Sequence, residues 1–315
     1  MDRERALLVL NNWRASHAFP LNTFQNGLRR RAAGIYEHAL VSQRLKRTPS
    51  VLSKLNRFHS MKLSQMQDIG GCRAVVRNRR ELLRIENAYL SSSIRHELIR
   101  RRDYIDVPKG DGYRCLHLMY KYVSDRSTEY NGLLIEIQLR TQLQHAWATA
   151  VETADILNRT NIKSGQGPKK WRRFFAVISS VFAEIEGTPH VRYTPRHSKR
   201  LRSRARSLAK ELRVFERLTS LAQALEVMTE PRHSSNDYYL LILNTQTFEL
   251  QGFGYSASEQ ADMNAHYIEA ERDSAPEEDI VVVATRTVKD LKRAYPNYFL
   301  DATRFIDRAS RALYG

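Results

Sequence analysis

The chain has 315 residues, a formal net charge of +17 and two cysteines, Cys72 and Cys115. Two cysteines exclude a disulfide scaffold and a four-cysteine zinc site, and they favour the reducing cytoplasm. No run approaches the roughly 18 consecutive apolar residues of a membrane span, and the charged start leads into no apolar signal segment.

The charge is distributed unevenly along the chain. Residues 231–315 carry 9 Lys and Arg against 13 Asp and Glu, whereas residues 1–230 carry 42 against 21. A strongly basic body favours an anionic partner such as a nucleotide, RNA or DNA, although charge alone fits an ordinary basic surface equally well. The balance changes near Pro231–Asn236, where we place a boundary.

The first elements are predicted from apolar spacing and from helix and strand signals. Residues 1–40 are expected to be helical, because their apolar residues recur at three- and four-residue intervals. A helix should begin at Thr48, which can cap it, with Pro49 at its first helical position. A strand over Ile69–Val76 and a helix over Arg79–Glu97 follow.

Strands and helices continue to alternate after this point. Strands are predicted over Tyr113–Val123 and Leu133–Arg140, followed by helices over Gln142–Leu157 and Trp171–Glu186 and a basic helical stretch over 192–217. The last quarter is predicted to contain strands over Tyr238–Leu243, Phe248–Tyr255 and Ile280–Thr285, a helix over Ser258–Arg272, and helices broken at Pro296. We therefore expect N-terminal helices (1–40), a main domain (41–230) and a small α/β accessory domain (236–315).

The segment Leu133–Thr141 alternates strictly. Successive strand residues point to opposite faces, so Glu136, Gln138 and Arg140 share one face with Leu134, and the opposite face is fully apolar. The polar face can line a cleft, or it can belong to an ordinary half-exposed strand.

Upstream of that strand, a loop rich in Pro and Gly runs into the strand at Tyr113. Tyr113 and His117 lie four residues apart and share a face. An aromatic ring at a cleft edge can stack on a nucleobase, and Lys109 on the loop can reach a phosphate. Taken singly, a Tyr or a His more often packs in a core.

Two further stretches carry charges suited to a nucleoside triphosphate. Asp68 precedes Gly70-Gly71, and together with Glu136 it would supply two carboxylates to hold Mg²⁺. Arg44, Lys46 and Lys54 could grip phosphates or stack on a base, although a solvated basic face explains them as well.

In this order, these stretches resemble the synthetase domain of the RelA/SpoT family, which makes alarmone nucleotides. The resemblance covers about residues 40–157 and rests on Asp68-Ile69 with Gly71 and Arg73, on Asp103-Tyr104-Ile105 through His117, and on Glu136–Thr141 followed by Ala146-Trp147-Ala148. It implies an α+β fold in which a mixed sheet of about five strands is flanked by helices, with a small C-terminal α/β appendage added in this chain.

The resemblance also implies a reaction, in which the β,γ-diphosphate of ATP passes to the 3′-hydroxyl of GDP or GTP. It implies that Asp68 and Glu136 bind Mg²⁺ and that Glu136 orients or deprotonates the hydroxyl. The implied ATP contacts are Arg44, Lys46, Lys54, Arg73 and Arg77. The implied acceptor contacts are Lys109, Tyr113, His117 and Gln138. Such a transfer needs neutralised charge and alignment more than covalent catalysis.

The sequence departs from the family pattern in two places. None of the ten histidines is followed by Asp, so the His-Asp hydrolase of bifunctional members is not expected. Position 111 is Asp, where many guanosine-specific members have an amide or Ser, and this leaves the acceptor open.

Three functions therefore remain. The first is a small alarmone synthetase acting on a guanine nucleotide. The second is a toxic relative that pyrophosphorylates the 3′ end of tRNA or an adenine nucleotide, in which the basic stretch Arg192–Arg217 would contact RNA. The third is an inactive nucleotide or RNA sensor. No membrane partner is expected, the acidic tail could dock on the basic body, and the sequence leaves open whether the protein forms a homo-oligomer.

Overall fold

The computed structural model describes residues 3–158, 167–219, 238–244, 250–273, 275, 278–284 and 302–315. The expected boundary at Pro231–Asn236 and the break at Pro296 lie outside these residues. Among the described residues, no helix is long and apolar enough to cross a membrane.

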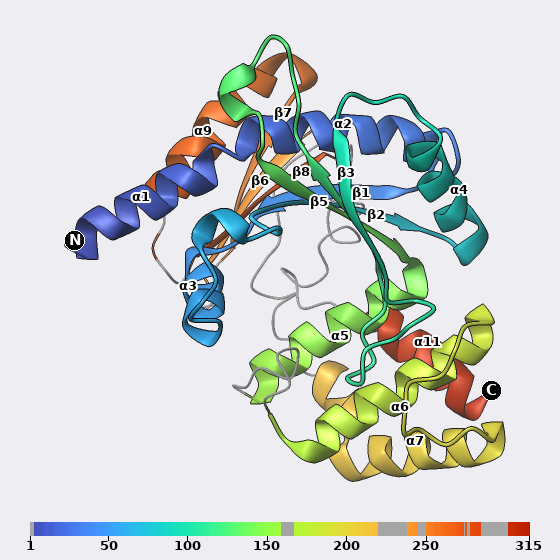
Figure 1. Cartoon of the computed structure of the whole chain (residues 1–315). Coiled ribbons are helices and arrows are strands. Elements are labelled where there is room, and N and C mark those ends of the chain that lie inside the picture. Colours follow the sequence, from blue (N-terminus) through green and yellow to red (C-terminus); the bar gives the residue numbers. More distant parts are fainter. Residues whose placement is uncertain are drawn as a thin grey trace.

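The described strands form a single mixed sheet of eight strands in the order β3-β4-β5-β2-β1-β8-β6-β7 (Figure 1). Strand β2 runs parallel to β5, and the other neighbouring pairs are antiparallel. The first five strands make up the mixed sheet that the resemblance implied. The strands are β1 (Leu40–Leu45), β2 (Gly70–Val76), β3 (Glu97–Asp103), β4 (Leu116–Lys121), β5 (Leu134–Thr141), β6 (Tyr238–Asn244), β7 (Leu250–Tyr255) and β8 (Glu278–Ala284).

The C-terminal strands continue this sheet and do not form the separate appendage that the change in charge had suggested. β8 pairs with β1 through Ser42↔Val283 and Gln43↔Val282, and Leu240 and Val282 belong to the same apolar core as β1, β2 and β5. The net charge of a segment reflects its surface residues and does not determine which strand it pairs with. In this protein β8 pairs with the edge of β1 that β2 leaves free.

One face of the sheet is apolar and is covered by helices. Helices α2 (Ala18–Ala33), α4 (Arg79–Leu90) and α9 (Gln260–Asp273) pack over it, and their buried residues join one core with the strands (Figure 1). Helix α1 (Arg3–Ala15) packs against α9. Short helices complete this half: α3 (Thr48–Arg57), η1 (Leu63–Gln65), η2 (Thr128–Tyr130) and η4 (Ala257–Glu259).

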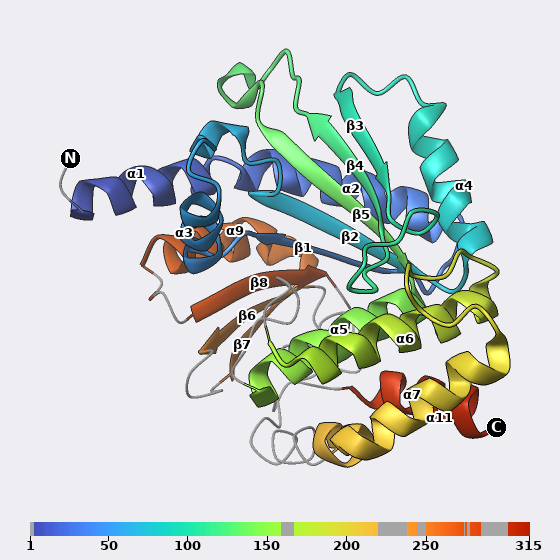
Figure 2. The same cartoon turned by 60° about the horizontal axis from the view of Figure 1, so that its bottom comes forward.

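A second helical layer has a core of its own. Helices α5 (Gln142–Asn158), α6 (Lys169–Glu186), α7 (Ser198–Leu212) and α11 (Thr303–Tyr314) lie together in this layer (Figure 2). They enclose buried aromatic side chains that include Trp171, Phe174 and Phe305. Thr141 and Gln144 start α5 as a capping box, in which the Thr141 hydroxyl accepts from the Gln144 amide (3.2 Å) and the Gln144 side chain accepts from the Thr141 amide (3.3 Å).

Two local predictions were wrong. The helix expected over Arg79–Glu97 ends at Leu90, and an unexpected strand, β3, begins at Glu97. β3 is an edge strand that is exposed along most of its length, so it carries no alternating pattern to read. Thr48 does not cap α3: the cap position is Arg47, and the Thr48 hydroxyl donates to Asn11 (3.1 Å).

Candidate functional site

The face of the sheet opposite helices α2, α4 and α9 carries a row of polar side chains contributed by neighbouring strands. In register, Arg44 of β1 lies opposite Gly71 of β2, which lies opposite Glu136 of β5. One step along, Arg73 lies opposite Gln138, which in turn lies opposite His117 of β4. Gly71 has no side chain, so the space between Arg44 and Glu136 stays open.

The alternation predicted for β5 is confirmed. Ile135, Ile137 and Leu139 are fully buried in the core beneath the helices. Glu136 and Gln138 line the cleft on the other face. The alternation along β5 therefore places one set of side chains in the core and the other set in the cleft.

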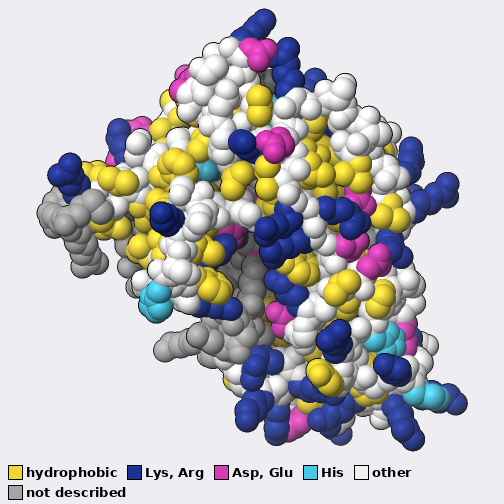
Figure 3. All heavy atoms as spheres, in the orientation of Figure 1, with side chains coloured by type: hydrophobic (Ala, Val, Ile, Leu, Met, Phe, Trp, Pro, Cys, Tyr) yellow, Lys and Arg dark blue, Asp and Glu magenta, His cyan; other side chains and the backbone are white. Residues whose placement is uncertain are grey.

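The polar row lines a small, partly enclosed cleft with a cavity volume of about 70 Å³. Figure 3 shows a hollow at the centre of this side of the molecule, with Lys and Arg side chains gathered at its edge. The structure brings six of the predicted site residues to its lining. The lining residues are Ser42, Gln43, Arg44, Lys46, Asp68, Gly71, Cys72, Arg73, Glu136 and Gln138.

Asp68 lies at the entrance to β2 and is held between two lysines. Its carboxylate contacts Nζ of Lys46 at 2.9 Å and Nζ of Lys54, on α3, at 2.8 Å. Burial alone would raise the pKa of Asp68, but the two ammonium groups outweigh burial and lower it to about 2. Asp68 is therefore an anion at neutral pH, and the predicted Lys46, Lys54 and Asp68 form one cluster.

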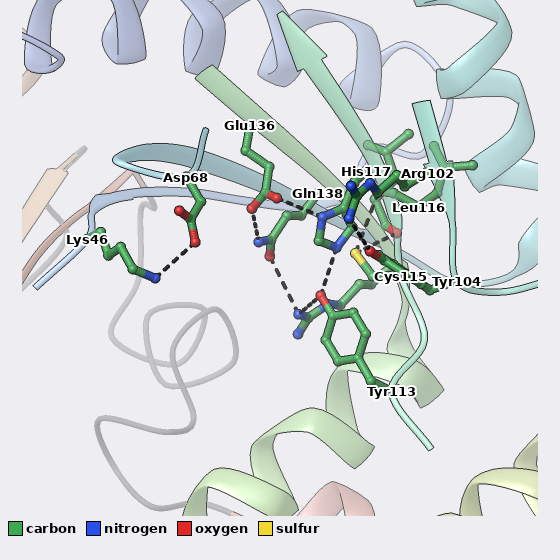
Figure 4. A network of polar contacts seen from close by, with 12 residues as sticks. Lys46, Asp68, Arg102, Tyr104, Tyr113, Cys115, Leu116, His117, Glu136 and Gln138 are labelled. Atoms are coloured by element: carbon green, nitrogen blue, oxygen red, sulfur yellow. Dashed lines mark hydrogen bonds and ion pairs between the residues drawn. The ribbon is translucent and has the colours of Figure 1, made fainter. Parts of the chain in front are cut away.

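Glu136 is the centre of a hydrogen-bonded chain that leads out to Tyr113 (Figure 4). One Glu136 oxygen lies 2.7 Å from Nδ1 of His117, and the other accepts from the Gln138 amide. Nε2 of His117 lies 2.8 Å from the Tyr113 hydroxyl. Both ring nitrogens of His117 are thus occupied by protein groups.

The protonation states of this chain follow from its partners. Burial disfavours charge on His117, but Cys115, Tyr113 and Glu136 around it raise its pKa well above the usual range. Burial would raise the pKa of Glu136, yet the hydrogen bonds from His117 and Gln138 lower it. The pair is therefore an imidazolium donating to a carboxylate.

Arg140 contacts this chain of residues, although it was not among the site residues that the family resemblance implied. It is buried, its Nη2 donates to the Tyr113 hydroxyl at 3.0 Å, and its guanidinium lies 5.2 Å from the Tyr113 ring centre. The signal was present in the sequence, because Arg140 shares the polar face of β5 with Glu136 and Gln138.

The Tyr113 ring is surrounded by other groups of its own loop. Nζ of Lys109 lies 4.9 Å from its centre and 4.5 Å from that of Tyr104, and the Tyr104 ring packs edge-on against Tyr113. Asp111 accepts from the Tyr113 amide at 2.9 Å, so its carboxylate shapes the turn.

Arg77 is not brought to the cleft. Its side chain is 65% exposed, and its guanidinium pairs with Glu81 at 2.7 Å and lies over the ring of Tyr36. The Glu81 carboxylate also accepts from the Arg77 amide at 2.9 Å, while Asn78 caps α4 through the Glu81 amide. Arg77 thus belongs to the start of α4, because β2 ends at Val76.

Two carboxylates of the cleft could hold Mg²⁺. No group of three or more His, Cys, Asp or Glu that could hold a metal occurs among the described residues. Asp68 and Glu136 line one cleft and both are anionic. One or two carboxylates, completed by phosphate oxygens and water, are the usual protein share of a magnesium site.

Comparison with known proteins finds similarity over the region that contains this site. Residues 43–159 match the model of the region found in RelA / SpoT proteins. Over 124 residues the chain is 32% identical to GTP pyrophosphokinase YjbM of Bacillus subtilis (strain 168), which covers 39% of this chain and 58% of that protein. The resemblance to the RelA/SpoT family is thus confirmed for residues 43–159, and the chain spans 58% of the length of this curated relative.

Solved structures give weaker similarities. Small alarmone synthetase 1 of Bacillus subtilis, bound to its product pppGpp, is 24% identical and matches 53% of this chain and 90% of its own, with a TM-score of 0.45. Small alarmone synthetase 2 of the same organism is 19% identical, matches 59% and 95%, and has a TM-score of 0.46. The fold of this protein accordingly rests on its own strand order and register.

Proposed function

We propose that this protein is an ATP:nucleotide 3′-diphosphotransferase that converts GDP or GTP to ppGpp or pppGpp. The observation that carries the proposal is the single cleft in which Asp68, Lys46 and Arg44 face Glu136, which His117 links to Tyr113. This arrangement separates a basic triphosphate end from an aromatic acceptor end.

At the donor end, the cations hold ATP. Lys46 and Lys54 neutralise the triphosphate, and Arg44 and Arg73, on adjacent strands, grip its oxygens or stack on adenine. Asp68 and Glu136 would hold Mg²⁺, which when bound neutralises charge on the transferring diphosphate. The two lysines that now pair with Asp68 can turn to the phosphates.

At the acceptor end, Tyr113 stacks on the base. The base takes the position of the exposed Lys109 side chain, which then meets the acceptor phosphates. Glu136 accepts a hydrogen bond from the 3′-hydroxyl and aligns it with the diphosphate. His117, with both nitrogens engaged, acts by holding Glu136, and Gln138 holds the other carboxylate oxygen.

A second candidate acceptor is the 3′ end of tRNA. The observation that favours it is the basic surface of α7 and the loop before it, where Figure 3 shows Lys and Arg side chains gathered at the lower edge. Tyr193, in the same stretch, is 89% exposed and available for stacking. The exposed cations are Arg192, Arg196, Lys199, Arg200, Arg204, Arg206 and Lys210.

One assay tests both candidates. The protein is incubated with Mg²⁺ and ATP labelled in the γ-phosphate, and GDP, GTP, ADP, ATP and bulk tRNA are offered separately. Label on GDP or GTP is expected. Label on tRNA alone would replace the first candidate by the second, label on an adenine nucleotide would overturn both, and no transfer at all would favour the inactive sensor.

A further inference from the structure

The loop that carries Tyr113 is held from outside the RelA/SpoT region, by helix α6. Gly112 has φ +99° and leaves no room for a side chain: an added Cβ would lie 2.9 Å from the Phe175 carbonyl oxygen, from Ser179 and from Trp147. The loop backbone is therefore pressed directly against α5 and α6. Such contact fixes the position of residue 112 on the helices.

A buried hydroxyl reinforces this contact. The Ser179 hydroxyl donates to the Gly112 carbonyl at 2.6 Å and accepts from Nε of Arg114 at 3.0 Å. Gly112 and Arg114 are the two neighbours of Tyr113 in the chain. One atom of α6 thus bonds the backbone of the residue before Tyr113 and the side chain of the residue after it.

The Arg114 side chain also bonds the start of the loop and the segment that follows α6. Its guanidinium is buried and donates to the carbonyl oxygens of Ile105 (3.0 Å) and Pro189 (2.6 Å) and to the Thr188 hydroxyl (3.3 Å). Ile105 begins the loop, and Thr188 and Pro189 follow the end of α6 at Gly187. A charged group with this many partners is costly to disturb, because each lost bond leaves a buried donor unpaired.

We propose that Ser179 is a positioning residue for the acceptor site, which holds loop 104–115 through Gly112 and Arg114 so that Tyr113 presents its ring to the base. This inference rests on the proposed function, because it takes Tyr113 as the acceptor contact. It assigns a role in substrate binding to a helix that lies beyond the matched residues 43–159.

The adjacent Ser180 provides a matched control. It is equally buried on α6, and its hydroxyl also makes two hydrogen bonds, one from the Val191 amide (2.9 Å) and one with the Thr194 hydroxyl (2.9 Å), but neither reaches the acceptor loop. Ser179→Ala and Ser180→Ala therefore remove the same chemistry from the same helix.

The experiment measures steady-state transfer with ATP and GDP for both variants. Ser179→Ala should raise the KM for GDP about tenfold, with the KM for ATP near its starting value, whereas Ser180→Ala should leave the KM for GDP unchanged. An equal change in both variants, or an unchanged KM for GDP in Ser179→Ala, would overturn the proposal. If Ser179→Ala does not fold, Ser179→Cys, which keeps the volume and a weak donor, should still raise the KM for GDP.

Amide hydrogen exchange separates failure of this proposal from failure of the proposed function. Peptides covering 104–115 should exchange faster in Ser179→Ala than in Ser180→Ala whether or not the protein transfers diphosphate. A wild-type protein without activity refutes the proposed function, and equal exchange in the two variants refutes the attachment of the loop.

Discussion

Replacing Tyr113 by phenylalanine removes one hydroxyl and leaves the ring. That hydroxyl lies 3.0 Å from Nη2 of Arg140 and 2.8 Å from Nε2 of His117, and both partners are buried cations. A hydrogen bond with a charged donor contributes about 1.5–3 kcal/mol, and buried donors left unpaired keep their desolvation cost. We therefore expect Tyr113→Phe to lower the free energy of unfolding by about 3 kcal/mol, which corresponds to a fall in Tm of roughly 5–10 °C.

The same change should reduce turnover more than acceptor binding. Without its Tyr113 contact the His117 ring is free to turn, and Glu136 loses a fixed partner, so kcat should fall about 10- to 100-fold. The ring still stacks on the base, so the KM for GDP should change little. Tyr113→Ala removes the ring as well, and since stacking contributes ~1–3 kcal/mol per base, the KM should also rise about tenfold or more.

Tyr104→Phe is the control for these two variants. Its hydroxyl accepts from Nη1 of the exposed Arg102 at 3.0 Å, and its ring packs on Tyr113. We expect this variant to keep the wild-type kcat and Tm, because its lost bond lies in solvent. The measurements are thermal unfolding and transfer of label from ATP. A Tyr113→Phe variant that matches Tyr104→Phe in both would refute the chain from Tyr113 to Glu136.

Three other outcomes can be tested directly. Glu136→Gln should lower turnover by about 10²-fold or more while ATP still binds, as followed by equilibrium titration; full turnover would disprove the role of the carboxylate. Asp68 has a pKa near 2 in the folded protein against a usual 3.8, so its contribution is complete above about pH 4 and is lost as the pH falls through 2. Asp68→Asn should therefore lower the free energy of unfolding by about 2 kcal/mol at pH 7, measured by denaturant unfolding. The difference from the wild type should shrink below pH 4. A difference that does not depend on pH would contradict the pairing of Asp68 with Lys46 and Lys54. Lys46→Met should raise the KM for ATP about tenfold, whereas Arg77→Met should not, and an equal rise in both would return Arg77 to the site.

Much of the site could be predicted because its residues follow local patterns. The alternation in β5 placed Glu136 and Gln138 on one face, and a strand entered through two glycines placed Asp68 at its mouth. Arg77 was assigned to ATP by the resemblance, but the strand ends one residue earlier and the side chain turns to Glu81. Arg77 lies between the end of β2 and the start of α4, and its side chain and backbone amide both contact Glu81 of α4.

Other features depend on contacts between distant segments. β3 has no periodicity of its own and becomes a strand because β4 offers it a hydrogen-bonding edge. Ser179 is one serine of a buried helix, and nothing in its neighbours in the chain indicates that it meets Gly112, 67 residues away.

The sequence by itself determined the alternation of strands and helices, the polar face of β5 and the identity of the charged groups, because strand and helix periods and residue chemistry are local properties, whereas the mixed sheet was implied by the family resemblance. Only the tertiary structure decided that β8 joins β1, that Arg140 lies against Tyr113, and that α6 bonds the loop that carries Tyr113. Strand edges and buried hydrogen bonds are satisfied by whichever segments fold against them, and the partners are chosen by packing across the whole chain.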